Sequence, residues 1–370
     1  ASEIPLSDWS SDVCSSDHFN VGGGFGRFDF DAALNTRTQF DNFTMGNGEE
    51  RENTSFANHS GSVRLGARIS DTWRIDGSFN TFVGEDIEAP GAYTDGTRGQ
   101  SSKDVRLNGG DVRLDGSIGT HAIRATLHHS RETDERRNET AGIIPFHENT
   151  RYTTFEGLQL QDAWTIAEHY TLIGGMDYER VENENLRFNA SGANVRPSSP
   201  NDRRVTTAVF ADASARLLEN RLILNGGLRY DSIDLELLPT PLRPDVVPGT
   251  STVTTTNPRA GLVFMPGGGW RLHATAGRGF VAPAANQTSG YYDETVGAQR
   301  RITRGNPDLS PESAWSYDAG IGYDQRLFSV DLTWFHIDVT DKIESVFVTN
   351  TPTLRESTYV NASTATSSGL

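Results

Sequence analysis

Strict alternation of apolar and polar residues is the feature that most limits how this chain can fold. In the segment 221–231, Leu224 and Leu228 share one parity, while Arg229 and Asp231 share the other. Successive side chains of an extended strand point to opposite faces, so such a segment predicts a strand with one apolar and one polar face. The same pattern recurs in segments 63–69, 111–119, 209–217, 270–278 and 328–334. No helical period of useful length is present, so the sequence predicts an all-β fold.

The connections between these segments alternate in length. Short polar turns are expected at 70–72, 119–121, 167–169, 218–220, 266–269 and 324–327, and long polar stretches at 35–60, 84–109, 131–150, 183–204, 236–255 and 280–310. The turns recur about every 50 residues, in the manner of up-and-down hairpins. Short periplasmic turns at one end and long extracellular loops at the other are typical of an antiparallel transmembrane β-barrel, here with about fourteen strands.

Aromatic residues flank the short turns. Trp73 follows the first of them, and Trp270 and Tyr323 each lie beside a later one. Further rings in equivalent positions are Trp164, Tyr170, Phe264 and Phe328. Rings at strand ends match the interfacial girdle of a membrane barrel, although aromatic residues also favour strands in general.

Hydropathy agrees with a barrel rather than a helical membrane protein. The mean hydropathy is −0.51, and no apolar run approaches the roughly 18 residues that a spanning helix needs. Because every main-chain group in hydrocarbon must be paired, closed sheets are the remaining way to span. Charged residues belong on the polar face, since each would cost about 2–4 kcal/mol against lipid. We expect Arg64, Arg113, Arg229 and Asp331 there.

Net charge and cysteine content exclude other classes. The formal charge of −16 argues against a nucleic-acid partner, because such surfaces need clustered positive charge. Cys14 is the only cysteine, which excludes an internal disulfide and a multi-cysteine metal site.

The first 17 residues differ from the rest. The stretch DWSSDVCSSD (8–17) has no strand or helix period and is similar to a translated sequencing adapter. We therefore interpret 1–17 as a non-native segment and 18–370 as a partial barrel domain that is cut at both ends. A flexible polar N-terminus is the alternative.

Three ordered motifs carry a family resemblance. NPRAGLVFMP (257–266), WRLHATAGRGFVAP (270–283) and RGNPDLSPESAWSYDAGIGY (304–323) resemble the barrel of TonB-dependent outer-membrane receptors of the siderophore or vitamin B12 type. The detailed resemblance covers about 222–370. The motif residues, which we expect to set barrel geometry, are Asn257, Pro258, Arg259, Arg278, Gly279, Phe280, Pro283, Asn306, Pro307, Asp308, Leu309, Pro311 and Glu312.

The resemblance implies an architecture and an activity. The family has a 22-strand barrel closed by an N-terminal plug that carries the TonB-contacting segment; neither is visible in this sequence. It implies active uptake of a scarce ligand, such as a ferric siderophore or a cobalamin, across the outer membrane of a Gram-negative bacterium, with outer-membrane lipid and the TonB complex as partners. In the long loop 280–310, Tyr291 and Tyr292 are candidate ligand-binding residues, because their rings could stack on an aromatic chelate or a corrin.

The NPDLSP segment is expected to bring that loop back to the barrel. Pro307 and Pro311 fix φ and lack amide donors, which favours a turn. The following strand is expected over 313–323, with Tyr317, Ala319 and Ile321 on its apolar face.

Patterns for catalysis or cofactor binding are absent from the sequence. VGGGFGRF (21–28) is not a phosphate-binding loop, because Arg27 replaces the last glycine and no helix follows. His128 and His129 point to opposite faces of a strand, and the acidic segments 132–140 and 179–187 suit solvated loops better than divalent-ion sites. We expect no enzyme, cofactor or metal centre. The alternatives are a passive porin-like or adhesin barrel and a soluble β-propeller, whose blades also repeat near every 50 residues.

Overall fold

The computed structural model describes residues 14–51, 53–88, 101–138, 144–244 and 246–370, and most of them lie in strands. Fifteen strands of this part have twelve or more residues, close to the number expected from the sequence. They are β1 (Cys14–Phe25), β2 (Phe28–Gln39), β5 (Phe56–Arg68), β6 (Trp73–Glu88), β7 (Ser102–Ile118), β8 (His121–Asn138), β9 (Phe146–Ala167), β10 (Tyr170–Phe188), β12 (Asp202–Leu217), β13 (Leu222–Leu237), β14 (Gly249–Gly267), β15 (Trp270–Val281), β18 (Glu312–Asp324), β19 (Ser329–Asn350) and β20 (Leu354–Gly369).

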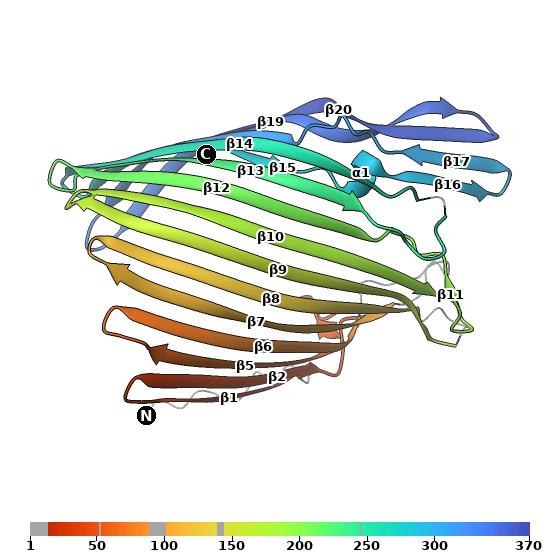
Figure 1. Cartoon of the computed structure of the whole chain (residues 1–370), viewed down its shortest axis with the longest axis horizontal. Helices are drawn as coiled ribbons and strands as arrows, with labels where there is room; N and C mark the ends of the chain where they lie inside the picture. The colour runs from red at the N-terminus through yellow and green to blue at the C-terminus, as the bar shows by residue number, and fades with distance from the viewer. Residues whose placement is uncertain (1–13, 52, 89–100, 139–143, 245) are drawn as a thin grey trace. The chain divides into compact units, whose positions relative to one another are not determined.

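The remaining elements are short. They are β3 (Phe43–Thr44), β4 (Glu50–Arg51), β11 (Asn194–Val195), β16 (Tyr291–Val296), β17 (Gln299–Arg304) and the helix α1 (Ala285–Ser289). Eighteen of the strands belong to one hydrogen-bonded sheet, and β3 pairs with β4 alone (Figure 1). The all-β prediction is therefore confirmed.

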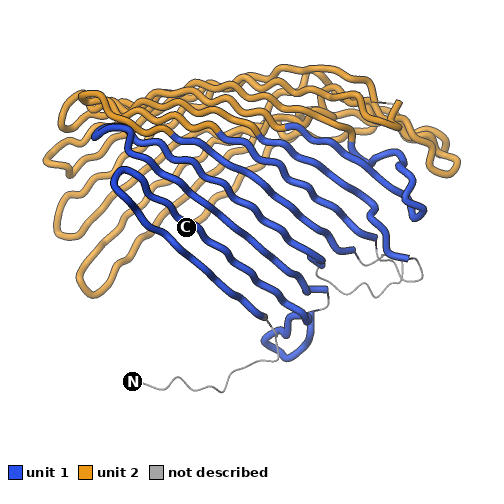
Figure 2. The backbone as a smooth tube through the Cα atoms, turned by 60° about the horizontal axis from the view of Figure 1, so that its bottom comes forward, with its two compact units in different colours: residues 1–113, 128–155, 182–199 blue, residues 114–127, 156–181, 200–370 orange. Residues whose placement is uncertain are grey.

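The chain divides into two compact units (Figure 2). The first consists of Ala1–Arg113, His128–Phe155 and Glu182–Ser199, and the second of Leu114–Leu127, Glu156–Val181 and Pro200–Leu370. In the first unit β1, β2, β5 and β6 pair in this order, each antiparallel to the next. In the second unit β12, β13, β14, β15, β18, β19 and β20 do the same. Both units are thus up-and-down meanders.

The short turns lie where the sequence placed them, to within about two residues. They occupy 69–72, 119–120, 168–169, 218–221, 268–269 and 325–328, and a further turn at 26–27 was not predicted. The long connections are shorter than expected: β13 continues to Leu237 and β14 begins at Gly249, so residues 236–237 and 249–255 of the predicted loop 236–255 lie in strands. We assigned polar residues to loops. A paired strand can also carry polar residues on both faces, wherever both faces meet water.

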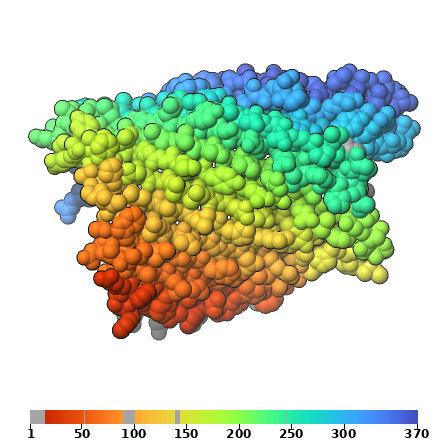
Figure 3. Space-filling view, viewed as in Figure 1, coloured from red at the N-terminus to blue at the C-terminus, as the bar shows by residue number. Residues whose placement is uncertain are grey.

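Among the described residues, the apolar face of each unit is largely exposed. In β5, Val63 and Leu65 are 45% and 62% exposed, while Arg64 between them is ion-paired. In β13, Leu228 is 52% exposed, whereas Asp231 on the other face is 2% exposed. The strands β12 to β15 form consecutive bands of one surface in the space-filling view (Figure 3). Exposed apolar side chains that recur on several neighbouring strands need an apolar environment.

Two rows of aromatic rings border the apolar face of β18 and β19. Near the short turns, the Tyr323 ring lies 4.6 Å from that of Trp270 and 5.8 Å from that of Phe328. The second row contains stacked or tilted rings of Trp315, Tyr317, Trp334 and His336. Along β18, Tyr323 and Trp315 are about 26 Å apart at about 3.3 Å per residue. This separation fits the height of a barrel's apolar band, about 25 Å.

The segment between β15 and β18 departs from the expected loop. Residues 282–311, which we call the strap, contain α1 and the hairpin β16–β17 rather than loop alone. The expected strand after NPDLSP is confirmed as β18, in which Tyr317 and Ile321 are exposed on one face. The helix was missed because its five residues are too few for a helical period.

Residues 1–13 of the interpreted adapter segment lie outside the described residues. Cys14 to Asp17 begin β1 and pair with Gln39 to Thr36 of β2. The assignment of 1–17 as non-native remains a prediction.

Gly269 gives a test of the turn between β14 and β15. Its φ is +89°, and an added Cβ would lie 2.3 Å from the Asp324 carbonyl oxygen. Gly268 also has a positive φ, but a Cβ there would have 3.9 Å to its nearest atom. We expect Gly269→Ala to lower the free energy of unfolding by at least about 2 kcal/mol, and Gly268→Ala by about 1 kcal/mol. Urea titration of tryptophan fluorescence in lipid vesicles measures both, and equal losses would contradict the geometry.

Candidate ligand-binding site

The strap, with its helix and its hairpin, lies at the loop end of the second unit. Its helix α1 contacts β12, β13, β14 and β20. The side chain of Gln287 accepts a hydrogen bond from the Ala284 N–H at 2.8 Å, which satisfies one of the free donors at the start of the helix. Thr288 is buried, and its Oγ1 donates to the Ala285 carbonyl oxygen at 3.2 Å. The helix is therefore a packed part of the fold.

A small apolar core holds the strap in place. Ile233, Leu235 and Leu237 alternate along β13 on the face that carries Arg229 and Asp231 nearer the short turns, and they are at most 3% exposed. The other members are Val246, Val253 and Ala285, with Phe280, Ala282 and Tyr292 packed against them. The polar face of β13 thus becomes apolar where the strap covers it. The alternation 233–237 was present in the sequence, but its last residue, Leu237, was assigned to a loop.

Tyr292, one of the two candidate ligand residues, belongs to this core. The Arg243 guanidinium lies over its ring, 4.7 Å from the centroid. Burial raises the pKa of the Tyr292 phenol to about 12, although the Arg243 charge acts in the opposite direction. Its ring packs against the protein.

Tyr291 lies on the other face of the hairpin. The Arg304 guanidinium is 4.9 Å from its ring centroid, and its hydroxyl donates to Asp293 Oδ2 at 3.3 Å. Arg300 Nε also donates to Asp293, at 2.9 Å. Because Tyr291 and Tyr292 are consecutive in β16, the structure does not bring the two rings to one face. Their role in ligand binding remains a prediction.

Residues of the NPDLSPE motif fasten the strap to β19 and β20. Asn306 Nδ2 donates to the Tyr359 carbonyl oxygen at 2.9 Å, and Glu312 Oε1 accepts from the Ile343 N–H at 2.8 Å. Asn361 completes the connection: its Oδ1 accepts from Ser310 N, while its Nδ2 donates to the carbonyl oxygens of Ser310 and Asp341.

The other residues of this motif shape the turn. Leu309 is 5% exposed, and the Asp308 N–H donates to the Asn306 side chain at 3.0 Å. Pro307 is exposed and Pro311 half-buried. The structural role of the motif remains a prediction.

The earlier motif residues contact β12, β13 and β14. Asn257 Nδ2 donates to Asp231 Oδ2 at 3.2 Å, and Arg259 Nη2 lies 2.7 Å from Asp212 Oδ1. Arg278 Nη1 donates to the Thr256 carbonyl oxygen at 2.8 Å. Of the remaining motif residues, Pro258 lies opposite Leu228, Pro283 is fully buried, Phe280 packs on the strap core, and an added Cβ at Gly279 would meet no atom within 4 Å.

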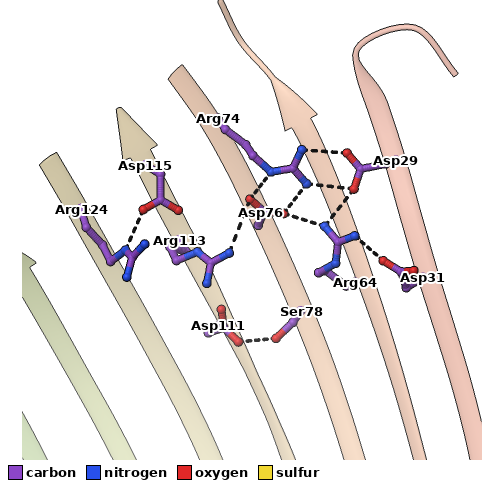
Figure 4. Close-up of polar contacts among 10 residues, drawn as sticks. All are labelled: Asp29, Asp31, Arg64, Arg74, Asp76, Ser78, Asp111, Arg113, Asp115 and Arg124. Carbon is purple, nitrogen blue, oxygen red and sulfur yellow. Dashed lines mark hydrogen bonds and ion pairs between the residues drawn. The ribbon is translucent and has the colours of Figure 1, made fainter. Parts of the chain in front are cut away.

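In the first unit the polar face carries a network of paired charges near the short turns. Arg64 Nη1 lies 2.9 Å from Asp29 and 2.8 Å from Asp76, and it also pairs with Asp31 through Nη2. Arg74 pairs with the same Asp29 and Asp76 at 2.8 and 2.6 Å. Figure 4 shows the guanidinium groups of Arg64 and Arg74 both reaching the carboxylate of Asp76.

All four charges that were assigned to the polar face have partners there. Arg113 Nη2 lies 3.9 Å from Asp76. In the second unit Arg229 pairs with Asp177 and Asp231, and Asp331 pairs with Arg271 at 2.8 Å. The sequence indicated these charges, but not their partners, because each pair joins different strands or positions two residues apart.

The described residues contain no group of three or more histidine, cysteine or acidic side chains arranged to hold a metal ion. In the acidic segments, Asp134 lies 3.7 Å from Lys103, and Glu179 lies 2.9 Å from Arg204. Within the described part of the chain, no helix is both long and apolar enough to span a bilayer.

The sequence and the fold of this chain are similar to those of known proteins. The sequence model of the family described as "TonB dependent receptor-like, beta-barrel" matches residues 8–370. The hemophore receptor HasR of Serratia marcescens has a TM-score of 0.73 at 17% identity, covering 96% of this chain and 59% of its own. The copper transporter OprC gives 0.74 at 15% identity, covering 95% and 56%.

The siderophore receptor PirA of Pseudomonas aeruginosa is also similar, with a TM-score of 0.65 at 14% identity, covering 96% of this chain and 58% of its own. At these identities the likeness shows the fold alone. This chain spans less than two thirds of each of the three solved chains. No curated protein matches.

An antiparallel sheet with an apolar face, a face of paired charges and short turns at one end defines a membrane β-barrel. The family match is more specific and covers nearly the whole chain. The chain belongs to the TonB-dependent receptor β-barrel family.

The buried phenol of Tyr292 predicts a pH dependence of stability. An unfolded tyrosine titrates near pH 10, whereas Tyr292 in the folded protein titrates near pH 12. Between these values the unfolded state binds fewer protons than the folded state, so stability is complete below about pH 10 and falls as the pH rises towards 12. We expect Tyr292→Phe to reduce this fall, and Tyr291→Phe to preserve it. Urea unfolding at pH 9, 10, 11 and 12 measures the effect; the same slope in both variants would contradict it.

The hydrogen bonds of Asn361 give a test of how the strap is fastened to β20. Asn361→Asp keeps the acceptor for Ser310 N but removes both donated hydrogen bonds. We expect a loss of about 1–3 kcal/mol, because two carbonyl oxygens lose a partner. Asn350→Asp, at an exposed residue of β19, is the matched control and should change stability little. Hydrogen exchange of residues 306–312 locates the effect; unchanged exchange in Asn361→Asp would show that Asn361 does not fasten the strap.

Proposed function

We propose that the chain is part of the barrel of an outer-membrane receptor that actively takes up a scarce ligand in a Gram-negative bacterium. The apolar faces of the strands contact outer-membrane lipid, and the faces of paired charges line an aqueous interior. Energy reaches the receptor from the TonB complex through an N-terminal plug, which the resemblance to the family implies.

One observation supports this proposal most directly. Exposed apolar side chains and ion-paired arginines alternate along the same strands in both units, as at Val63, Arg64 and Leu65. In water such a face would drive aggregation, whereas in a bilayer it is the required surface. The match of residues 8–370 to the receptor family favours a transport receptor over a passive porin-like or adhesin barrel and over a soluble propeller.

The ligand we propose is a metal chelate such as a ferric siderophore, with a cobalamin as the second possibility. Structural neighbours include a receptor for a hemophore, a siderophore receptor and a copper transporter. The strap presents Tyr291, Arg300 and Arg304 on its half-exposed face. A ring beside cationic groups suits a planar or anionic chelate.

Ligand uptake tests the function in the intact receptor. A bacterium whose only receptor of this family is the full-length protein carrying this chain should accumulate 55Fe-labelled siderophore or labelled cyanocobalamin. Accumulation should stop in a strain that lacks TonB. Equal uptake with and without TonB would identify a passive pore, and the absence of uptake for ferric siderophores, heme, copper and cobalamin would contradict the proposal.

Leu228 tests the orientation of the sheet. It is 52% exposed on the apolar face of β13, and Leu228→Arg would place a charge against lipid at a cost of about 2–4 kcal/mol. Ser214→Arg adds the same charge to the opposite face of β12, beside Asn225, and should cost less than 1 kcal/mol. Urea titration in phospholipid vesicles compares the two. A larger loss for Ser214→Arg would reverse the assignment of the faces.

A further inference from the structure

The ladder between β14 and β15 stops before either strand ends. Its pairs run from Gly267 and Trp270 to Arg259 and Gly277. Beyond them β14 continues to Gly249, paired with β13, while β15 continues to Val281, paired with β18. In this fully described part of the chain, β14 from Gly249 to Thr256 therefore has a strand partner on one side. We call its other side the open edge.

Two motif residues explain why the ladder stops. Pro258 has no N–H and cannot donate at the last position before the separation. Arg278 then occupies the end of the ladder: its Nη1 donates to the Thr256 carbonyl oxygen at 2.8 Å and to Thr255 Oγ1 at 3.1 Å. A side chain thus replaces the main-chain donor that a neighbouring strand would supply.

The contact with Arg278 also reveals which main-chain groups face the open edge. In an antiparallel strand the N–H and C=O of one residue point to the same side, and successive residues alternate. Because the Thr256 carbonyl points away from β13 to Arg278, the N–H and C=O groups of Thr250, Thr252 and Thr254 also point away from β13. The groups of Ser251, Val253 and Thr255 point towards β13, their strand partner.

The sequence does not protect this edge. Natural edge strands carry charges, proline or bulges that prevent pairing with another chain. The stretch GTSTVTTT (249–256) contains no charged residue and no proline, and threonine and valine favour extended structure. Thr252, Thr254 and Thr256 are exposed on one face, whereas Val253 and Thr255 are buried on the other. The edge strand is therefore extended, with its side chains buried on one face and exposed on the other.

The open edge belongs outside the hydrocarbon layer, since unpaired main-chain groups there would each cost several kcal/mol. It begins where Thr256 lies opposite Tyr230, towards the loop end of β13 and β14. On the proposed function, on which this step rests, the loop end faces the exterior of the cell.

We propose that the open edge of β14 is a docking site for an extended segment of a polypeptide partner, which adds to the sheet as a strand. Three donors and three acceptors of Thr250, Thr252 and Thr254 repeat at every second residue. The main chain of another extended segment supplies complementary groups at the same spacing. The partner is thus recognised through its backbone, and an uncharged segment with small or β-branched side chains fits beside the threonines.

Hydrogen exchange of the full-length receptor in detergent tests whether the edge is open. The amides of Thr250, Thr252 and Thr254 should exchange rapidly, and those of Ser251, Val253 and Thr255 slowly. Equal protection of all six amides would overturn the proposal.

Binding of a defined probe tests docking. We would use a fluorescent heptapeptide of alternating threonine and valine, with a version N-methylated at alternate residues as the probe control. Thr254→Pro removes one edge-facing N–H without removing a donor to β13, and should weaken binding about tenfold. Thr252→Lys adds a charge to the open edge and should also weaken peptide binding. This second variant keeps the test valid if Thr254→Pro fails to fold.

The matched protein control is Ser232→Lys. Ser232 lies directly opposite Thr254 on β13, a strand that is paired on both sides, so the same added charge there should leave binding unchanged. The proposal fails if the N-methylated peptide binds as well as the parent, or if Thr254→Pro and Thr252→Lys bind normally. Uptake of labelled ligand is measured on the unmodified receptor beside peptide binding. Normal uptake by an unmodified receptor that does not bind the parent peptide would overturn the docking site alone, whereas absent uptake with intact peptide binding would overturn only the transport function.

Discussion

Pairing of main-chain N–H and C=O groups is the constraint on which the rest of the structure depends. The described sheets have little covering protein, and their apolar side chains are largely exposed. Stability therefore relies on ladders that join each strand to its neighbours rather than on a central core. In lipid this requirement becomes strict, since no water can replace a missing partner.

The motif residues stand where the ladders are interrupted. Arg278 supplies a donor where β14 and β15 separate. Glu312 accepts from Ile343 N, and Asn361 bonds Ser310 and Asp341, beside the register shift in β19 near Val339 and Lys342. In each place a side chain performs the role of a missing strand. This gives a physical reason why asparagine, proline and arginine recur in these motifs. Proline ends a ladder, and the side chains of asparagine and arginine bond to main-chain groups that the ladder leaves unpaired.

The sequence could predict what depends on neighbouring residues. Alternation predicted the strands and their faces, and polar runs of a few residues predicted the short turns. It could not predict contacts between distant segments, such as the ion pairs that Arg64 and Arg74 both form with Asp29. The parallel pairing of β17 with β20 is of the same kind, since about 50 residues separate Arg300 from Leu354. Loop lengths were overestimated because polarity indicates exposure to water, not absence of pairing.

The candidate site illustrates the same limit. Sequence placed Tyr291 and Tyr292 together on a loop, where both rings would be free to meet a ligand. The hairpin puts them on opposite faces, because adjacent residues of a strand cannot share one. Tyr292 then joins a core built from Ile233, Leu235 and Leu237, of which only Leu237 fell within the predicted loop 236–255.

The two attachments of the strap determine how it can respond to a ligand. At one end its Ala285, Ala282 and Tyr292 pack against the core residues of β13 and β14. At the other it is hydrogen-bonded to β19 and β20 through Asn306 and Asn361. Releasing the first attachment alone would expose apolar surface at about 25 cal/mol per Å², and releasing the second would leave several carbonyl oxygens without partners at about 1–3 kcal/mol each. The hairpin β16–β17 is attached as well, because Tyr292 of β16 packs on the core and β17 pairs with β20. The side chains of Arg300 and Arg304 remain about half exposed. Adjustment to a ligand should therefore begin in these two side chains, while the backbone of the strap remains fixed.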